Sequence, residues 1–151
     1  MLIQRLRTID AAQVLALRRA VEQANPGPLG TAKERALATN VEEVDRLLSR
    51  QDGATFGVFA EGVLVGAAYV APASLSSTWF AVSAVTVHPD CRGRGIGRAL
   101  VEACIAHAAA AAAEGVTLDV NFPNPAAKAL YGRLGFEVWA TGASYSTERS
   151  R

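Results

Sequence analysis

A glycine-rich segment near the middle of the chain, Arg92-Gly93-Arg94-Gly95-Ile96-Gly97, constrains the fold more than any other stretch. An apolar, strand-like run from Trp79 to Val87 precedes it, and an alanine-rich, helix-like run from about Gly95 to Glu114 follows it. Glycines at the start of a helix let backbone N–H groups approach an anion closely, because no Cβ intervenes, and the helix dipole adds positive potential. The segment therefore predicts a pyrophosphate site at a strand–helix junction.

Three phosphate-binding patterns are candidates for this segment. The Walker loop requires Gly-Lys-Ser/Thr at its end, and the chain has Gly97-Arg98-Ala99 there. The dinucleotide fingerprint requires its third glycine one residue after Gly97, although Asp119 could mimic its ribose-binding acid. The pattern Arg/Gln-x-x-Gly-x-Gly/Ala is matched by Arg92, Gly95 and Gly97.

This third pattern resembles the coenzyme A loop of the GNAT family of N-acetyltransferases. The residues before it, Val85 to Pro89, resemble the central strand of that family and its exit. A second segment matches the family's fifth strand, its short helix with Asn and Tyr, and the start of its sixth strand: Leu118–Asn121, Asn124, Ala127, Leu130-Tyr131 and Leu134–Phe136. Two motifs in the right order and spacing are more specific than either alone, and the resemblance covers roughly residues 55 to 141.

The resemblance implies a single α/β (α+β) domain over residues 1–151. Its centre would be a mixed, twisted sheet of six to seven strands, flanked by about four helices. The fourth and fifth strands of this sheet would splay apart. Periodicity and turn residues predict strands at 2–7, 55–60, 63–70, 79–87, 116–120, 136–140 and 144–147, and helices at 10–24, 40–50, 95–114 and 125–135. Asp10 and Asn40 are the predicted N-caps, and the alanines from Ala108 to Ala113 are predicted to prolong the third helix. In the second helix the apolar side chains are predicted to face inward, namely Val41, Val44, Leu47 and Leu48. A tight turn is predicted at Glu61-Gly62.

Composition narrows the class of protein. The net charge of +1 argues against a general affinity for nucleic acid. No uncharged run reaches transmembrane length and the N-terminus does not read as a signal peptide, so we expect a cytoplasmic enzyme with no membrane partner. Cys91 and Cys104 have no Cys or His partner at metal-ligand spacing, and we expect neither a metal nor a disulfide.

The resemblance implies acetyl-CoA as the co-substrate. In the family, loop N–H groups hold the pyrophosphate and the central strand pairs with the pantetheine arm. The matching positions are the backbone of Val85 and Val87 and the loop residues Arg92, Gly93, Arg94, Gly95, Ile96, Gly97 and Arg98. Asn124 matches the pantetheine-contacting Asn of the family, and it can also cap the helix that follows it.

Tyr131 matches the family's general acid, which would protonate the departing thiolate. A thiol with a pKa near ~8.5 and a tyrosine with a pKa near ~10 allow that transfer without a large shift. The alternative role for Tyr131 is packing against Leu130 and Leu134.

The general base is not evident, because the run from Trp79 to Val87 contains neither a carboxylate nor a histidine. We expect deprotonation relayed by water, with Ser83, Asp119 and Glu137 as open candidates. His88 and His107 are predicted to be structural.

The leading hypothesis is acetyl transfer to a primary amine by direct attack in a ternary complex. One alternative is a non-catalytic acyl-CoA-binding sensor or partner module, which the missing strand carboxylate favours and Tyr131 disfavours. Another is a nucleotide-binding α/β domain. The acceptor would meet residues 25–40, 74–79 and the closing hairpin, and small amines, amino acids, aminoglycosides and protein or peptide amines remain open. Many family members form homodimers, so the resemblance also suggests one here.

Overall fold

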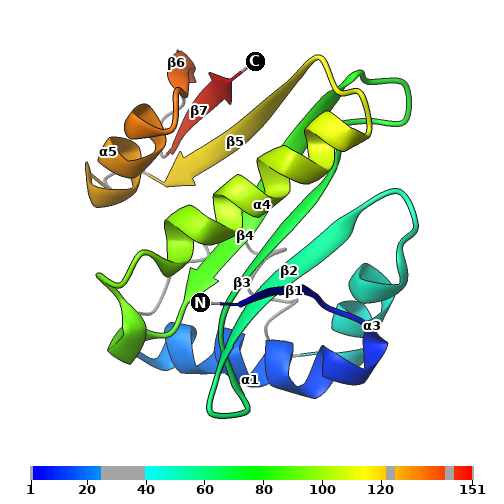
Figure 1. The fold of residues 1–151 in the computed structure, drawn as a ribbon, viewed down its shortest axis with the longest axis vertical. Coiled ribbons are helices and arrows are strands. Elements are labelled where there is room, and N and C mark those ends of the chain that lie inside the picture. The colour runs from blue at the N-terminus through cyan, green and yellow to red at the C-terminus, as the bar shows by residue number, and fades with distance from the viewer. Residues whose placement is uncertain (1, 25–39, 122–124, 142–144, 151) are drawn as a thin grey trace.

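The structure, a computed structural model, describes residues 2–24, 40–121, 125–141 and 145–150. Within these residues, seven strands form one mixed sheet in the order β1-β2-β3-β4-β5-β7-β6 (Figure 1). The strands are β1 (Ile3–Arg5), β2 (Ala54–Ala60), β3 (Val63–Pro72), β4 (Trp79–Val87), β5 (Gly115–Asn121), β6 (Glu137–Thr141) and β7 (Tyr145–Ser150). The helices are α1 (Ala11–Ala24), α3 (Val41–Ser49), α4 (Ile96–Ala110) and α5 (Pro125–Arg133), with 3-10 turns η1 (Thr8–Asp10) and η2 (Pro89–Cys91). The predicted fold class is confirmed.

Helices cover both faces of the sheet. Ala68 of β3 belongs to a buried cluster with Leu100 of α4, whereas its neighbour Ala67 belongs to a second cluster with Val14 of α1 and Val44 of α3. Because successive strand residues point to opposite faces, α4 lies on one face and α1 with α3 on the other. No helix within the described ranges combines the length and apolar character needed to cross a bilayer.

Local sequence signals explain two of the connections. The β2–β3 turn holds Glu61 at φ 51° and Gly62 at φ 80°, the left-handed pair that a tight hairpin requires. Asn40 begins α3, where its Oδ1 accepts the N–H groups of Glu42 at 2.8 Å and Glu43 at 3.3 Å. Both features were predicted from residue type and spacing.

Three local predictions are wrong. Asp10 does not cap α1: it lies in η1, and its Oδ2 accepts the N–H of Arg7 at 2.8 Å. Val41 of α3 is 46% exposed instead of facing inward. The alanine run ends α4 at Ala110, because Ala112 turns into the left-handed region at φ 60° and the N–H of Glu114 bonds to Thr78 O at 2.8 Å. These tertiary contacts outweigh helix propensity.

The central strand β4 carries a bulge that the sequence did not predict. Ala67 pairs with Thr86 and Tyr69 pairs with Ser83, so two residues of β4, Ala84 and Val85, oppose one residue of β3. Ala84 has φ 53°, and Thr86 Oγ1 donates to Ala84 O at 2.9 Å. Such a bulge adds one residue to a strand and bends it.

The parallel strands β4 and β5 pair over only part of their length. Their register runs from Trp79 with Gly115 to Val82 with Leu118 and, among the described residues, includes no pair after that point. Toward their carboxyl ends the two ribbons diverge (Figure 1). The edge of β4 that is not paired with β5 therefore begins next to the bulge.

Candidate active site

The connection from β4 to α4 is held in shape by its own backbone. His88 N–H donates to Val65 O at 2.8 Å and fastens the end of β4 to β3. His88 Nδ1 accepts the N–H of Asp90 at 3.2 Å, and Cys91 N–H returns to His88 O at 2.9 Å. His88 therefore caps η2, which is the structural role predicted for it.

Two glycines of the loop have backbone conformations that other residues rarely adopt. Gly93 has φ 77° and Gly95, the residue before α4, has φ 80°. A Cβ at either position would meet no atom within 4 Å, so backbone conformation rather than space explains these two glycines.

Gly97 lies where three elements meet. A Cβ on Gly97 would lie 3.8 Å from Val87 Cγ2 of β4 and 3.8 Å from Leu130 Cδ2 of α5. The start of α4 is therefore close both to the end of β4 and to the helix that carries Tyr131. The structure brings together these parts of the predicted site.

The first turn of α4 presents backbone donors. Gly95 makes no side-chain capping bond, and the earliest intrahelical bond at this end runs from Ala99 N–H to Gly95 O at 3.1 Å. The N–H groups of Ile96, Gly97 and Arg98 therefore have no intrahelical acceptor. Donors of this kind, with the positive end of the helix dipole, fit a phosphate group.

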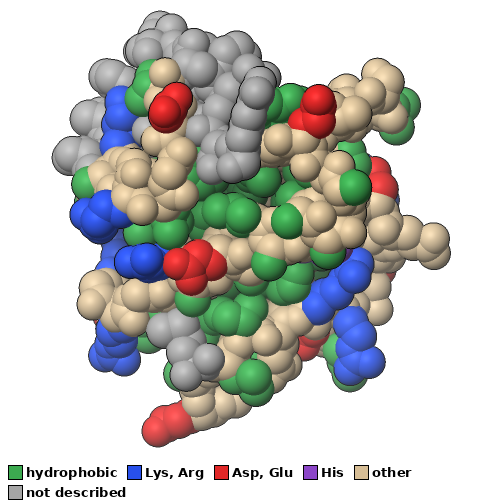
Figure 2. Space-filling model, turned by 45° about the horizontal axis from the view of Figure 1, so that its top comes forward, with side chains coloured by type: hydrophobic (Ala, Val, Ile, Leu, Met, Phe, Trp, Pro, Cys, Tyr) green, Lys and Arg blue, Asp and Glu red, His purple; other side chains and the backbone are tan. Residues whose placement is uncertain are grey.

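Arg92 and Arg94 of the segment and the adjacent Arg98 are exposed. Arg98 Nε donates to Glu102 Oε1 at 2.9 Å, so its side chain lies along α4. Arg92 and Arg94 flank the first positive-φ glycine, Gly93. Figure 2 shows Lys and Arg side chains on the side of the molecule where α4 begins.

Strand alternation orients the backbone of Val87. His88 bonds to Val65, whereas Val87 is the residue opposite Gly66. Hydrogen-bonded and non-hydrogen-bonded pairs alternate in an antiparallel ladder, so the N–H and C=O of Val87 face away from β3. They face the edge from which β5 has diverged, where an extended group could pair with them. Val85 belongs to the bulge.

Tyr131 is buried in α5, with 7% of its surface exposed. Its ring packs edge-to-face on Phe136 with centroids 6.0 Å apart, and its carbonyl accepts the N–H of Phe136 at 3.0 Å. Gly135, at φ 94°, allows the chain to turn back at this point. Tyr131 therefore packs in the core at the end of α5, and its ring contacts Phe136, whereas the packing alternative named Leu130 and Leu134. Asn124 lies outside the described residues.

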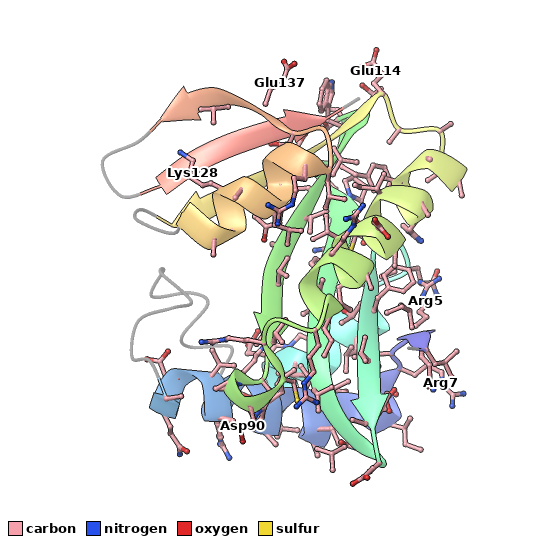
Figure 3. All side chains as sticks on the ribbon, turned by 60° about the vertical axis from the view of Figure 1, so that its left-hand side comes forward. Arg5, Arg7, Asp90, Glu114, Lys128 and Glu137 are labelled. Carbon is pink, nitrogen blue, oxygen red and sulfur yellow. The ribbon has the colours of Figure 1, made fainter. Side chains whose placement is uncertain are left out.

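The candidate bases fall in different places. Ser83 is exposed on β4 directly before the bulge. Glu137 on β6 and Asp90 beside the loop lie at opposite ends of the view in Figure 3, so Glu137 is remote from the loop. His107 packs on Phe56, with ring centroids 5.9 Å apart, and burial with the nearby Arg5 lowers its pKa, as suits a structural histidine. The side chain of Asp119 is outside the described part of the structure.

The two cysteines are unpaired. Cys104 is fully buried in the α4 cluster, and burial raises its pKa to about 12. The folded protein thus keeps a proton that the unfolded chain loses near its ordinary pKa of 9.0. Stability from this group is complete below that pH and is lost as the pH rises toward 12.

We therefore expect the free energy of unfolding to fall above about pH 9, by up to about 1.4 kcal/mol per pH unit from this thiol. Urea unfolding at several pH values would measure the slope. Because other groups titrate in the same range, Cys104→Ala is the reference, and its slope should be shallower than that of the wild type. Equal slopes would contradict the assignment.

No group of three or more His, Cys, Asp or Glu side chains in the described ranges is arranged to hold a metal ion. The site consists of a glycine turn, a helix N-terminus, an open strand edge and a nearby buried tyrosine. This donor set fits a ligand with a phosphate group at one end and an extended arm with amide groups.

Mycothiol acetyltransferases from two bacteria are similar to part of the chain. The mycothiol acetyltransferase of Kocuria rhizophila is 47% identical over 64 residues, which is 42% of this chain and 21% of the relative. That of Nocardiopsis dassonvillei is 41% identical over 68 residues, 45% of this chain and 21% of the relative. The matched region thus spans about a fifth of the length of these proteins.

Two solved structures share the fold over nearly the whole chain. The PaiA N-acetyltransferase of Thermoplasma acidophilum, in complex with coenzyme A, has a TM-score of 0.82 at 17% identity and covers 100% of this chain and 99% of that one. The ribosomal-protein-alanine N-acetyltransferase of Brucella melitensis has a TM-score of 0.83 at 20% identity and covers 99% of each. The model of the Acetyltransferase (GNAT) family matches residues 15–136. The chain belongs to the GNAT acetyltransferase family.

Proposed function

We propose that this protein is an acetyl-CoA-dependent N-acetyltransferase that acts on a primary amine. The observation that carries the proposal is the convergence at Gly97: the glycine turn opens α4 beside the free edge of β4 and beside α5. Family membership and the names of the partial relatives support the same activity.

Each part of the site has a role in this proposal. The N–H groups of the loop and of the first turn of α4 would bind the pyrophosphate, with Arg92 and Arg94 nearby. The backbone of Val87, and of Val85 within the bulge, would pair with the pantetheine arm. Asn124, just before α5, would contact the same arm. Arg98 would contribute mainly through its backbone, because its side chain pairs with Glu102.

Acetyl-CoA supplies a thioester, so that a C–N bond forms to the amine while the C–S bond breaks. The amine must lose one proton and the sulfur must gain one. Tyr131 is our candidate for the proton donor to sulfur. The described part of β4 carries no carboxylate, and Ser83 is the exposed side chain nearest the bulge along the strand, so we propose a water held there as the route for the amine proton.

The acceptor is an amine-bearing small molecule or peptide. Relatives named mycothiol acetyltransferases favour a small molecule, whereas the fold neighbour that acts on ribosomal-protein alanine argues for testing N-terminal peptides as well. A cytoplasmic location, a homodimer and the absence of nucleic-acid or membrane partners stay predictions.

The test is acetyl-CoA consumption, read as free thiol, over amines, amino sugars, amino acids and peptides, with calorimetry of acetyl-CoA binding on the same protein. Turnover with one acceptor class supports the enzyme and identifies that class. Binding without turnover on the whole panel would favour the sensor alternative. An absence of binding to any acyl-CoA would contradict the role of the Arg92–Gly97 loop.

A further inference from the structure

Buried hydroxyls without partners gather on the face of the sheet opposite α4. Among the described residues, Thr55 Oγ1, Tyr69 Oη and Thr117 Oγ1 are buried and make no hydrogen bond. Thr55 is the cross-strand neighbour of Tyr69, whose other neighbour is Ser83. Directly opposed residues point to the same face, so Thr55, Tyr69 and exposed Ser83 share it. Orphaned hydroxyls are costly, and a ligand is one way to satisfy them.

The face can be assigned from the core clusters. Ala68 and Val70, on either side of Tyr69, belong to the cluster that contains α4. Alternation therefore turns Tyr69 to the opposite face. Val82, which precedes Ser83, belongs to the α4 cluster as well. Tyr69 and Ser83 thus lie on the face opposite α4. Because the proposed cofactor loop opens α4, we assign this other face to the acceptor in the proposed function.

Tyr69 is closely packed around its hydroxyl. Its side chain is 8% exposed, and a Cβ on Gly53 would lie 2.7 Å from its Oη, so the hydroxyl end fits against a glycine. Burial raises the pKa of Tyr69, an effect that Arg50 partly opposes. The hydroxyl therefore remains a neutral hydrogen-bond donor at ordinary pH.

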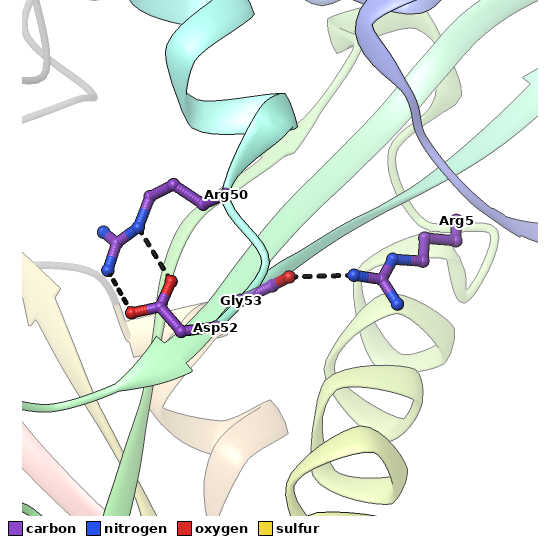
Figure 4. A network of polar contacts seen from close by, with 4 residues as sticks. All are labelled: Arg5, Arg50, Asp52 and Gly53. Carbon is purple, nitrogen blue, oxygen red and sulfur yellow. Dashed lines mark hydrogen bonds and ion pairs between the residues drawn. The ribbon is translucent and has the colours of Figure 1, made fainter.

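A second set of donors lies over the same ring. The guanidinium carbon of Arg50 is 5.9 Å from the Tyr69 ring centroid. Arg50 Nε and Nη2 donate to the two oxygens of Asp52 at 2.9 and 2.7 Å (Figure 4). Within the described residues, Nη1 of Arg50 has no partner. The Arg50 side chain is 46% exposed, so a ligand in solution can reach it.

We propose that Tyr69 and Arg50 form a subsite for a carboxylate carried by the acceptor, at a distance from its amine. The Tyr69 hydroxyl and Nη1 of Arg50 are both donors, and the ligand that complements two donors is an oxygen anion. Asp52 binds Nε and Nη2 of the Arg50 guanidinium, on the side away from Nη1. Oη is buried in this structure, so the groups packed around it must move for the carboxylate to reach it. This proposal rests on the proposed acetyl transfer, and it names the class of acceptor.

The experiment compares each amine acceptor as a free carboxylate and as its carboxamide, for example a dipeptide and its C-terminal amide. Wild type should favour the carboxylate in kcat/KM. Tyr69→Phe should lower kcat/KM for the carboxylate by about 10- to 100-fold, the value of a hydrogen bond to a charged group, and leave the carboxamide unchanged. Arg50→Gln should also lower kcat/KM for the carboxylate and leave the carboxamide unchanged.

Arg46→Gln is the matched control, because Arg46 is an exposed arginine of α3 that pairs with Glu43 at 2.6 Å. It should preserve the preference. Tyr69→Phe keeps the ring and removes a hydroxyl without a described partner, so its free energy of unfolding should not fall. This stability readout separates a binding role from a folding role.

Binding of the same probes is measured by calorimetry, apart from turnover. Carboxylate-selective binding that Tyr69→Phe abolishes supports the subsite even if no acetyl group is transferred, in which case only the proposed function fails. Equal binding of carboxylate and carboxamide, no binding of either, or equal losses for both probes in Tyr69→Phe would overturn the subsite.

Discussion

Replacing Tyr131 by Phe is expected to lower kcat by about 10²- to 10⁴-fold, the usual contribution of a positioned general acid. The ring would keep its edge-to-face contact with Phe136, so the packing at the end of α5 should survive. The substitution removes the hydroxyl, which is the proposed proton donor. Steady-state kinetics with the best acceptor, together with acetyl-CoA binding by calorimetry, would measure the effect.

The pH profile separates catalysis from packing. If Tyr131 protonates the leaving sulfur, the variant should lose the alkaline limb of the kcat profile and bind acetyl-CoA as tightly as the wild type. Urea unfolding of the same variant gives the structural control. Unchanged turnover across pH would remove Tyr131 as the acid and leave it with its packing role in the core.

Gly95→Ala is expected to weaken acetyl-CoA binding by about 10- to 100-fold, the value of one lost hydrogen bond to a charged group. Gly95 has φ 80°, and a residue with a Cβ in that region costs about 1–2 kcal/mol. Relief of this strain would rotate the N–H groups that we propose bind the phosphate. Calorimetry of acetyl-CoA binding would measure the loss.

Gly62→Ala is a close control for this substitution. Gly62 also has φ 80° and open space where its Cβ would lie, but it is in the β2–β3 turn. Both variants should lose similar stability, and only Gly95→Ala should lose affinity. Equal affinities in the two variants would mean that the shape of the Arg92–Gly97 loop does not matter for the cofactor.

The sequence was sufficient where a few adjacent residues decide the structure. Asn40 has an oxygen at the right spacing for the first N–H groups of α3, and Glu61-Gly62 tolerates the left-handed turn. The glycine loop could also be predicted from the sequence, because few residues other than glycine adopt the backbone conformations of Gly93 and Gly95. These features depend on short-range chemistry, which composition and spacing record.

The rest depends on contacts between distant segments. An alanine in a strand gives no sign that it will adopt φ 53°, and the bulge at Ala84 arises from pairing with β3. Alanine favours helix, yet Ala112 adopts a left-handed conformation beyond the end of α4, where the N–H of Glu114 bonds to Thr78 O. Tyr69 and Arg50 are far apart in sequence and meet only because β3 passes the end of α3. No local pattern predicts this pair.

The bulge also divides β4 into two segments whose inward positions have opposite parity. Phe80 and Val82 belong to the α4 cluster, and beyond the bulge Val85 and Val87 pack on that same cluster. The residues that face α4 therefore have even numbers before the bulge and odd numbers after it. An alignment of this strand with a relative that lacks the bulge needs a gap at Ala84. Without that gap, inward and outward residues would be exchanged over half of the strand, and site positions would be assigned to the wrong side chains.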